Sequence, residues 1–131
     1  MMKLMILKLI HTYALQYGMD PSICVSVAAV ESQFNPNVIG ITGDVGIFQL
    51  QRASFPKYTL KELLDPKLNV RLGVEYLAKT KAHCKYKNDL DWLVCYNYGI
   101  TNTARHVKHP NLFPYVKRVK IIMAAMKNET L

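Results

Sequence analysis

The chain has 131 residues, half of them hydrophobic and a fifth charged, so it is long enough to bury a core and has an ordinary globular composition. Seventeen Lys and Arg against nine Asp and Glu give a formal charge of +8, which draws a protein to polyanions such as nucleic acid, acidic lipids or the bacterial wall. No apolar run is long enough to cross a bilayer, so we expect no stable membrane insertion.

Apolar residues recur at helical spacing from the start of the chain. A first helix is expected over about residues 2–17, where Gly18 ends it. A second is expected over about residues 21–32, since Asp20 is a good N-cap and Pro21 suits the first helical position. The expected apolar stripe of the first helix consists of Leu4, Leu7, Ile10 or His11, and Ala14.

The segment of residues 33–45 is rich in Pro, Gly, Asn and Asp, which predicts an irregular loop or short hairpin after the second helix. A short helix is expected to begin near Gly46. Further on, Thr59 and Glu62 have the spacing of a capping box and predict another helix start.

Three more helices are expected. Asp65-Pro66 opens the first of them, and the others cover about residues 89–98, ended by Gly99, and residues 114–127. The apolar faces of the first two consist of Val70, Gly73, Val74 and Leu77, and of Leu90, Leu93, Val94 and Asn97. The sequence has no repeats and no linker, which predicts a single all-α domain over residues 1–131. We expect this domain to act as a monomer.

The three cysteines form no close-spaced motif, and their odd number argues against a disulfide framework. Cys24 and Cys95 lie in apolar stretches and are expected to be small core residues, whereas Cys84 has no assigned role. The four histidines are scattered, so we expect no metal site.

The first ten residues are apolar with two lysines and superficially resemble a signal peptide. Lys8 and His11 interrupt the apolar region, however, and no small-residue cleavage site follows. We therefore expect an amphipathic helix and no signal peptide.

Glu31 ends a strongly apolar helical run. A carboxyl group beside a buried helix is costly to ionise, and burial can leave its proton available near neutral pH. A general acid for glycoside cleavage needs this property, although a glutamate where a helix emerges into solvent would have the same position.

Two further segments carry polar groups among apolar residues. Gln49 follows a glycine-rich stretch that includes Gly46, and its amide suits sugar hydroxyls and N-acetyl groups. Asn97 lies between Tyr96 and Tyr98, and aromatic rings beside an amide are common in sugar sites. A glycine turn and a helix C-cap are the structural alternatives.

In this order, the segments resemble the motifs of the lytic transglycosylase family related to goose-type lysozyme, over about residues 9–125. The matching motifs are Glu31-Ser32, Gly46-Ile47-Phe48-Gln49, Cys95-Tyr96-Asn97-Tyr98-Gly99 and Tyr115-Val116. The resemblance implies a lysozyme-like all-α fold. Many family members have serine where this chain has Gly40.

The resemblance also implies a reaction. Glu31 would be the sole acid/base in cleaving the bond between N-acetylmuramic acid and N-acetylglucosamine of peptidoglycan, leaving 1,6-anhydromuramyl ends without metal or cofactor. Ser32 would help to position Glu31, and Tyr115 would reach towards it. The residues that would line the sugar cleft are Gly46, Ile47, Gln49, Tyr96, Asn97 and Tyr115.

Three alternatives remain open. A hydrolase of the goose-type lysozyme kind would need a carboxylate to hold water, and Asp44 is the candidate. A non-catalytic wall-binding or assembly module would not need Glu31. A nucleic-acid-binding domain has no supporting motif. A wall enzyme without a signal peptide would reach its substrate through a virion, host lysis or a secretion apparatus.

Overall fold

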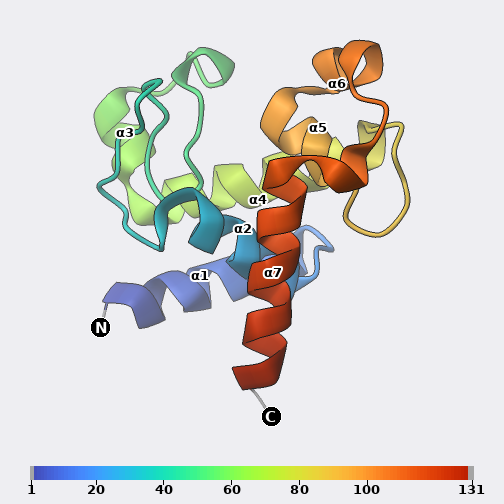
Figure 1. Cartoon of the computed structure of the whole chain (residues 1–131). Coiled ribbons are helices and arrows are strands. Elements are labelled where there is room, and N and C mark those ends of the chain that lie inside the picture. Colours follow the sequence, from blue (N-terminus) through green and yellow to red (C-terminus); the bar gives the residue numbers. More distant parts are fainter. Residues whose placement is uncertain (1, 130–131) are drawn as a thin grey trace. The chain divides into compact units, whose positions relative to one another are not determined.

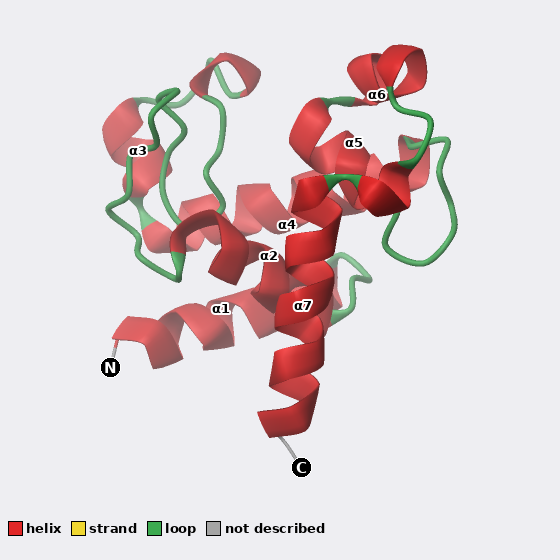
Figure 2. Ribbon diagram, viewed as in Figure 1, coloured by secondary structure: helices red, strands yellow, loops and turns green. Residues whose placement is uncertain are grey.

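The computed structural model describes residues 2–129, and within this range it consists of α-helices, short 3-10 helices and loops, with no β-strand (Figures 1 and 2). The predicted all-α fold class is confirmed. The chain forms two compact units, residues 1–75 and residues 76–131, and each is described by itself. The single-domain organisation stays a prediction. No helix within residues 2–129 has the length and apolar character needed to span a membrane.

The first unit begins with helices α1 (Met2–Gln16) and α2 (Pro21–Ser32), which pack against each other (Figure 1). The Asp20 carboxylate accepts a hydrogen bond from the Ser22 backbone N–H at 2.8 Å, as the predicted N-cap requires. The buried stripe of α1 consists of Ile6, Ile10, Tyr13 and Ala14. Of the predicted stripe, Ile10 and Ala14 are confirmed, whereas Leu4 is exposed and Ile6 and Tyr13 take core positions instead.

The first unit continues through a loop into η1 (Arg52–Ser54), α3 (Leu60–Leu64) and α4 (Pro66–His83). Both predicted starts are confirmed. Thr59 and Glu62 form the complete capping box, and the Asp65 carboxylate accepts a hydrogen bond from the Leu68 N–H at 3.0 Å. All four residues predicted for the apolar face of α4 are buried.

The loop after α2 contains no regular element, as predicted, but the short helix expected near Gly46 does not form. Residues 46–49 make a tight turn, closed by two backbone hydrogen bonds between Val45 and Leu50 at 3.0 and 2.9 Å. Gly46 and Gln49 have φ angles of 75° and 49°, in the left-handed region that a right-handed helix cannot use.

The second unit contains the end of α4 and helices α5 (Leu93–Tyr98), α6 (Ile100–His106) and α7 (Pro114–Glu129), with η2 (Pro110–Leu112) before α7. Within it, α5 packs against α6 and α7. The prediction for α7 is confirmed. The helix expected over residues 89–98 begins only at Leu93, because the preceding residues form turns with Asp89 at a φ of 47°. Helix α6 was not predicted.

A disulfide joins Cys84, which follows α4, to Cys95 in α5, with 6.0 Å between their Cα atoms. The sequence argument against a disulfide was wrong, because the fold brings Cys84, directly after the end of α4, next to Cys95 in α5. Cys24 is a buried free cysteine, as expected. Residues 2–129 contain no cluster of side chains suited to a metal ion.

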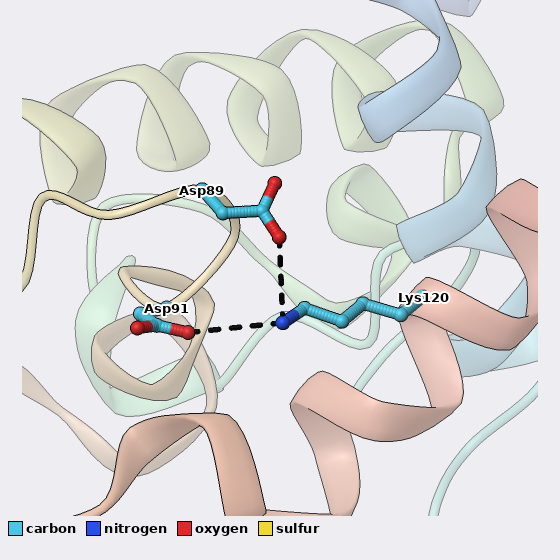
Figure 3. A network of polar contacts seen from close by, with 3 residues as sticks. All are labelled: Asp89, Asp91 and Lys120. Atoms are coloured by element: carbon cyan, nitrogen blue, oxygen red, sulfur yellow. Dashed lines mark ion pairs between the residues drawn. The ribbon is translucent and has the colours of Figure 1, made fainter.

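Helix α7 is also held by an ion-pair network (Figure 3). The Lys120 ammonium lies 3.4 Å from a carboxylate oxygen of Asp89 and 3.9 Å from one of Asp91, both in the segment before α5. The pair with the exposed Asp89 contributes only about 0.2–1 kcal/mol, whereas the Asp91 side chain is only 16% accessible. The network fixes where these two acidic side chains lie.

Candidate active site

Glu31 is the penultimate residue of α2, at the point where this helix leaves the core. The middle of α2 is buried, whereas Ala29, Val30 and Glu31 are partly exposed. The chain turns sharply after the helix, because both Gln33 and Phe34 adopt positive φ angles, 52° and 63°. Glu31 is thus a partly buried carboxyl group at the end of an apolar helix.

Ser32 connects the end of α2 to the tight turn of residues 45–50. Its buried hydroxyl donates to the Ile47 carbonyl at 2.8 Å, and the Ala28 carbonyl lies at 3.3 Å as a weaker acceptor. This hydrogen bond therefore holds the turn against the end of α2, one residue after Glu31. The role implied for Ser32, positioning the Glu31 side chain, stays a prediction.

Asn69 of α4 anchors the same turn from the other side. Its amide nitrogen donates to the carbonyls of Val45 and Leu63 at 2.9 and 2.8 Å, and its amide oxygen accepts from the Phe48 N–H at 2.8 Å. The side chain is fully buried, so these bonds satisfy backbone groups that water cannot reach. Sequence reasoning did not assign this role to Asn69.

Two glycines allow this close packing. A Cβ atom at Gly46 would lie 2.4 Å from the amide nitrogen of Asn69, and one at Gly73 would lie 2.3 Å from the ring of Phe48. Phe48 and Ile47 are fully buried. The Ile47 side chain is therefore part of the core, and Ile47 could contact a ligand only through its backbone.

Gln49 belongs to the loop's own hydrogen-bond network. Its amide nitrogen donates to the carbonyls of Val38 and Gly46 at 3.1 and 2.9 Å. Its amide oxygen lies 2.6 Å from the position of a Cβ atom at Gly40, so the glycine in place of the family's serine makes room for it. Both N–H groups are used within the protein, which leaves the oxygen for the predicted sugar contact.

Asp44, the candidate carboxylate of the hydrolase alternative, lies in the same loop and is partly buried. It accepts a hydrogen bond from the Thr42 hydroxyl at 3.2 Å, and its backbone carbonyl accepts from the Gly40 N–H at 2.8 Å.

In the second unit, Tyr96 and Tyr115 are brought together. The centres of their rings are 6.5 Å apart. The ring of Tyr96 also contacts that of Tyr76, with 5.4 Å between the ring centres. The guanidinium of Arg118 lies 5.8 Å from the centre of the Tyr115 ring. The sequence predicted Tyr96 and Tyr115 as site residues but not Tyr76. The position of Tyr76 within a helix does not distinguish it from an ordinary core residue.

The sequence predicted that Asn97 lies on the apolar face of its helix, and the structure shows that it does not. Helix α5 buries residues 93–96, and both Asn97 and Tyr98 are exposed. The late start of α5 and the turn at Gly99 leave too short a helix for the assumed apolar stripe to continue. Asn97 is thus accessible to a ligand, although the prediction that it is buried among apolar residues was wrong.

The model of the Transglycosylase SLT domain family matches residues 8–115. The chain belongs to this family. The predicted family and its lysozyme-like all-α fold class are thereby confirmed, and the matched segment of this SLT domain contains every predicted site residue.

Two relatives of this SLT domain are both described as endo-type membrane-bound lytic murein transglycosylase A. The protein from Klebsiella pneumoniae subsp. pneumoniae is 29% identical over 73 residues, and that from Salmonella enteritidis PT4 is 27% identical over 73 residues. Each match covers 47% of this chain and 36% of the relative, so the chain matches about a third of their length.

Proposed function

We propose that this chain is a peptidoglycan lytic transglycosylase with Glu31 as its acid/base. The observation that carries the proposal is the position of Glu31: a partly buried carboxyl group at the end of α2, beside a turn that Ser32 and Asn69 hold rigidly. The family match over residues 8–115 gives this carboxyl group its reaction class.

In the proposed reaction, the Glu31 carboxyl donates its proton to the oxygen that links N-acetylmuramic acid to N-acetylglucosamine. The bond between the muramyl anomeric carbon and this oxygen breaks. The muramyl 6-hydroxyl oxygen then bonds to the anomeric carbon, and its proton passes to the Glu31 carboxylate. The product has a 1,6-anhydromuramyl end, water is not consumed, and Glu31 regains its starting state.

Other residues of the family motifs would orient the sugar. A fixed backbone at Gly46 and Ile47 presents the same polar groups to each substrate, which lowers the entropic cost of orientation. The exposed amide of Asn97 suits sugar hydroxyl groups. The paired rings of Tyr96 and Tyr115 are buried and would support this contact from within the second unit. These contacts are part of the proposal.

The experiment is digestion of purified sacculi, with the released muropeptides analysed by mass spectrometry. Glu31→Gln removes the acid, and Glu62→Gln is the matched control, since a capping box accepts either residue at this position. Anhydromuramyl ends from the wild type and the control, but not from Glu31→Gln, are expected.

Hydrated reducing ends would replace the proposal with a hydrolase and would direct attention to Asp44. No product from the wild type would favour a binding or assembly module. Retained activity in Glu31→Gln would refute the role of that residue. Delivery by a virion, host lysis or a secretion apparatus stays a prediction that this assay does not address.

A further inference from the structure

The positive charge of the protein lies almost entirely in its second unit. Residues 76–131 contain ten Lys and Arg against three Asp and Glu, a formal charge of +7, whereas residues 1–75 contain seven against six, a charge of +1. Residues 92–128 contain no acidic residue at all. The asymmetry is far larger than solubility requires, because a solvated surface usually mixes both signs.

Part of this charge is gathered by contacts between two segments far apart in the sequence. The Lys85 ammonium donates to the Ala104 carbonyl at 3.3 Å, and the Tyr86 hydroxyl donates to the Val107 carbonyl. The segment after α4 therefore lies along the end of α6. This places Lys85 beside the exposed basic residues of the last turn of α6 and of the segment after it. We call the group the basic surface: Lys85, Arg105, His106, Lys108 and His109.

Two acidic residues of this unit, Asp89 and Asp91, are engaged away from the basic surface. Asp89 and Asp91 are both directed to Lys120 of α7, at 3.4 and 3.9 Å (Figure 3). Within residues 2–128, no acidic side chain forms an ion pair with Arg105 or Lys108. The basic surface is therefore an uncompensated source of positive potential.

The disulfide makes this surface rigid. Cys84 precedes Lys85 directly, and its bond to Cys95 fixes the start of the segment that carries Lys85 and Tyr86. Charges held in place before binding lose less conformational entropy on contact with a partner.

We propose that the basic surface binds the carboxylates of the peptide stems of peptidoglycan and so docks the protein on its substrate. The stems repeat along each glycan strand and make the wall a polyanion, and the Arg105 guanidinium can bind a carboxylate through two parallel hydrogen bonds. The inference rests on the proposed function for its choice of partner. A bilayer fits less well, because an interfacial surface needs a broad apolar face and the residues that define the basic surface are all polar.

The test measures co-sedimentation with purified sacculi in the Glu31→Gln background, so that the wall stays intact. Arg105→Gln/Lys108→Gln removes two charges from the basic surface, and Lys61→Gln/Lys67→Gln removes two exposed charges from the first unit as the matched control. Circular dichroism verifies that both double variants are folded.

We expect the first double variant to bind sacculi roughly fivefold more weakly than the control at low salt, since each exposed charge pair contributes little. The difference should vanish near 1 M salt, where the screening length is about 3 Å. Glycan strands stripped of their stems by an amidase should bind the two variants equally.

Equal binding of both variants to intact sacculi at low salt would overturn the proposal. An unchanged difference on stripped glycan would assign the contact to the sugar chain, and a larger loss on double-stranded DNA than on sacculi would assign it to nucleic acid. Either result overturns the role of the stems. Co-sedimentation measures binding and needs no catalysis. A failure of the proposed reaction would therefore not change its result, and the two proposals can be tested independently.

Discussion

Asn69 gives the sharpest test of how the turn beside Glu31 is held. Asn69→Ala would leave two buried backbone groups without a partner, the Phe48 N–H and the Leu63 carbonyl. It would also remove one of the two hydrogen bonds that the Val45 carbonyl accepts, the other being from the Leu50 N–H. A buried polar group without a partner costs about 1–3 kcal/mol, so even the low end predicts a loss of about 2 kcal/mol. That is a substantial part of the ~5–15 kcal/mol by which proteins are usually stable.

The assay is urea unfolding followed by circular dichroism, with muropeptide release measured below the unfolding transition. Asn111→Ala is the control, because this asparagine is exposed and its loss should change stability by under about 0.5 kcal/mol. We expect Asn69→Ala to lose both stability and most of its activity.

Asn69→Asp separates shape from hydrogen bonding. The aspartate has nearly the same size and can still accept from the Phe48 N–H, but it cannot donate to the two carbonyls when ionised. It should therefore destabilise the protein at neutral pH at least as much as alanine. A loss below about 1 kcal/mol in either variant would show that the turn does not depend on these bonds, and would refute the reasoning.

Three further outcomes are expected. Gln49→Ala removes two hydrogen bonds inside the loop and should lower the free energy of unfolding by about 1–2 kcal/mol; unchanged stability with reduced activity would instead favour a direct sugar contact. Replacing Cys84 and Cys95 by serine opens a cross-link between residues 11 apart and should cost about 2–3 kcal/mol in urea unfolding, and an unchanged midpoint would contradict this. Burial raises the pKa of the Cys24 thiol from 9.0 to about 12, so iodoacetamide at pH 8 should label it only after unfolding, and stability should fall as the pH rises from 9.0 towards 12; rapid labelling of the native protein would be inconsistent with this burial.

Local signals predicted the helices well. The bounds of α2 followed from Asp20, Pro21 and the apolar run after them, and the start of α3 followed from the capping box at Thr59. Each of these signals acts between residues two or three positions apart, so the sequence contains the whole interaction.

Non-local contacts were missed for the opposite reason. The partners of Asn69 in the turn lie 21 and 24 residues away, and nothing in the sequence around Asn69 distinguishes it from an ordinary polar helix residue. The Cys84–Cys95 pair was missed because a count of three cysteines gives no information about which two meet. Asn97 was misplaced because helical periodicity was extended through residues 89–92, which form turns.

Of the candidate site, Glu31 was predicted from its place at the end of an apolar helix together with the family motifs. The roles of the residues around it were less predictable. Residue type shows that Ser32 and Gln49 can form hydrogen bonds, but only the folded arrangement shows that both bond to backbone carbonyls of the protein itself.

The burial of Cys24 also bears on how the chain acquires its correct covalent form. Three cysteines allow three pairings, and the two that involve Cys24 would close much longer loops than the pairing of Cys84 with Cys95. Once α2 is packed against α1, its thiol is inaccessible and remains protonated, so it cannot attack an existing disulfide. Oxidation after this packing step therefore has a single product, and the protein should not need an isomerase to reach it.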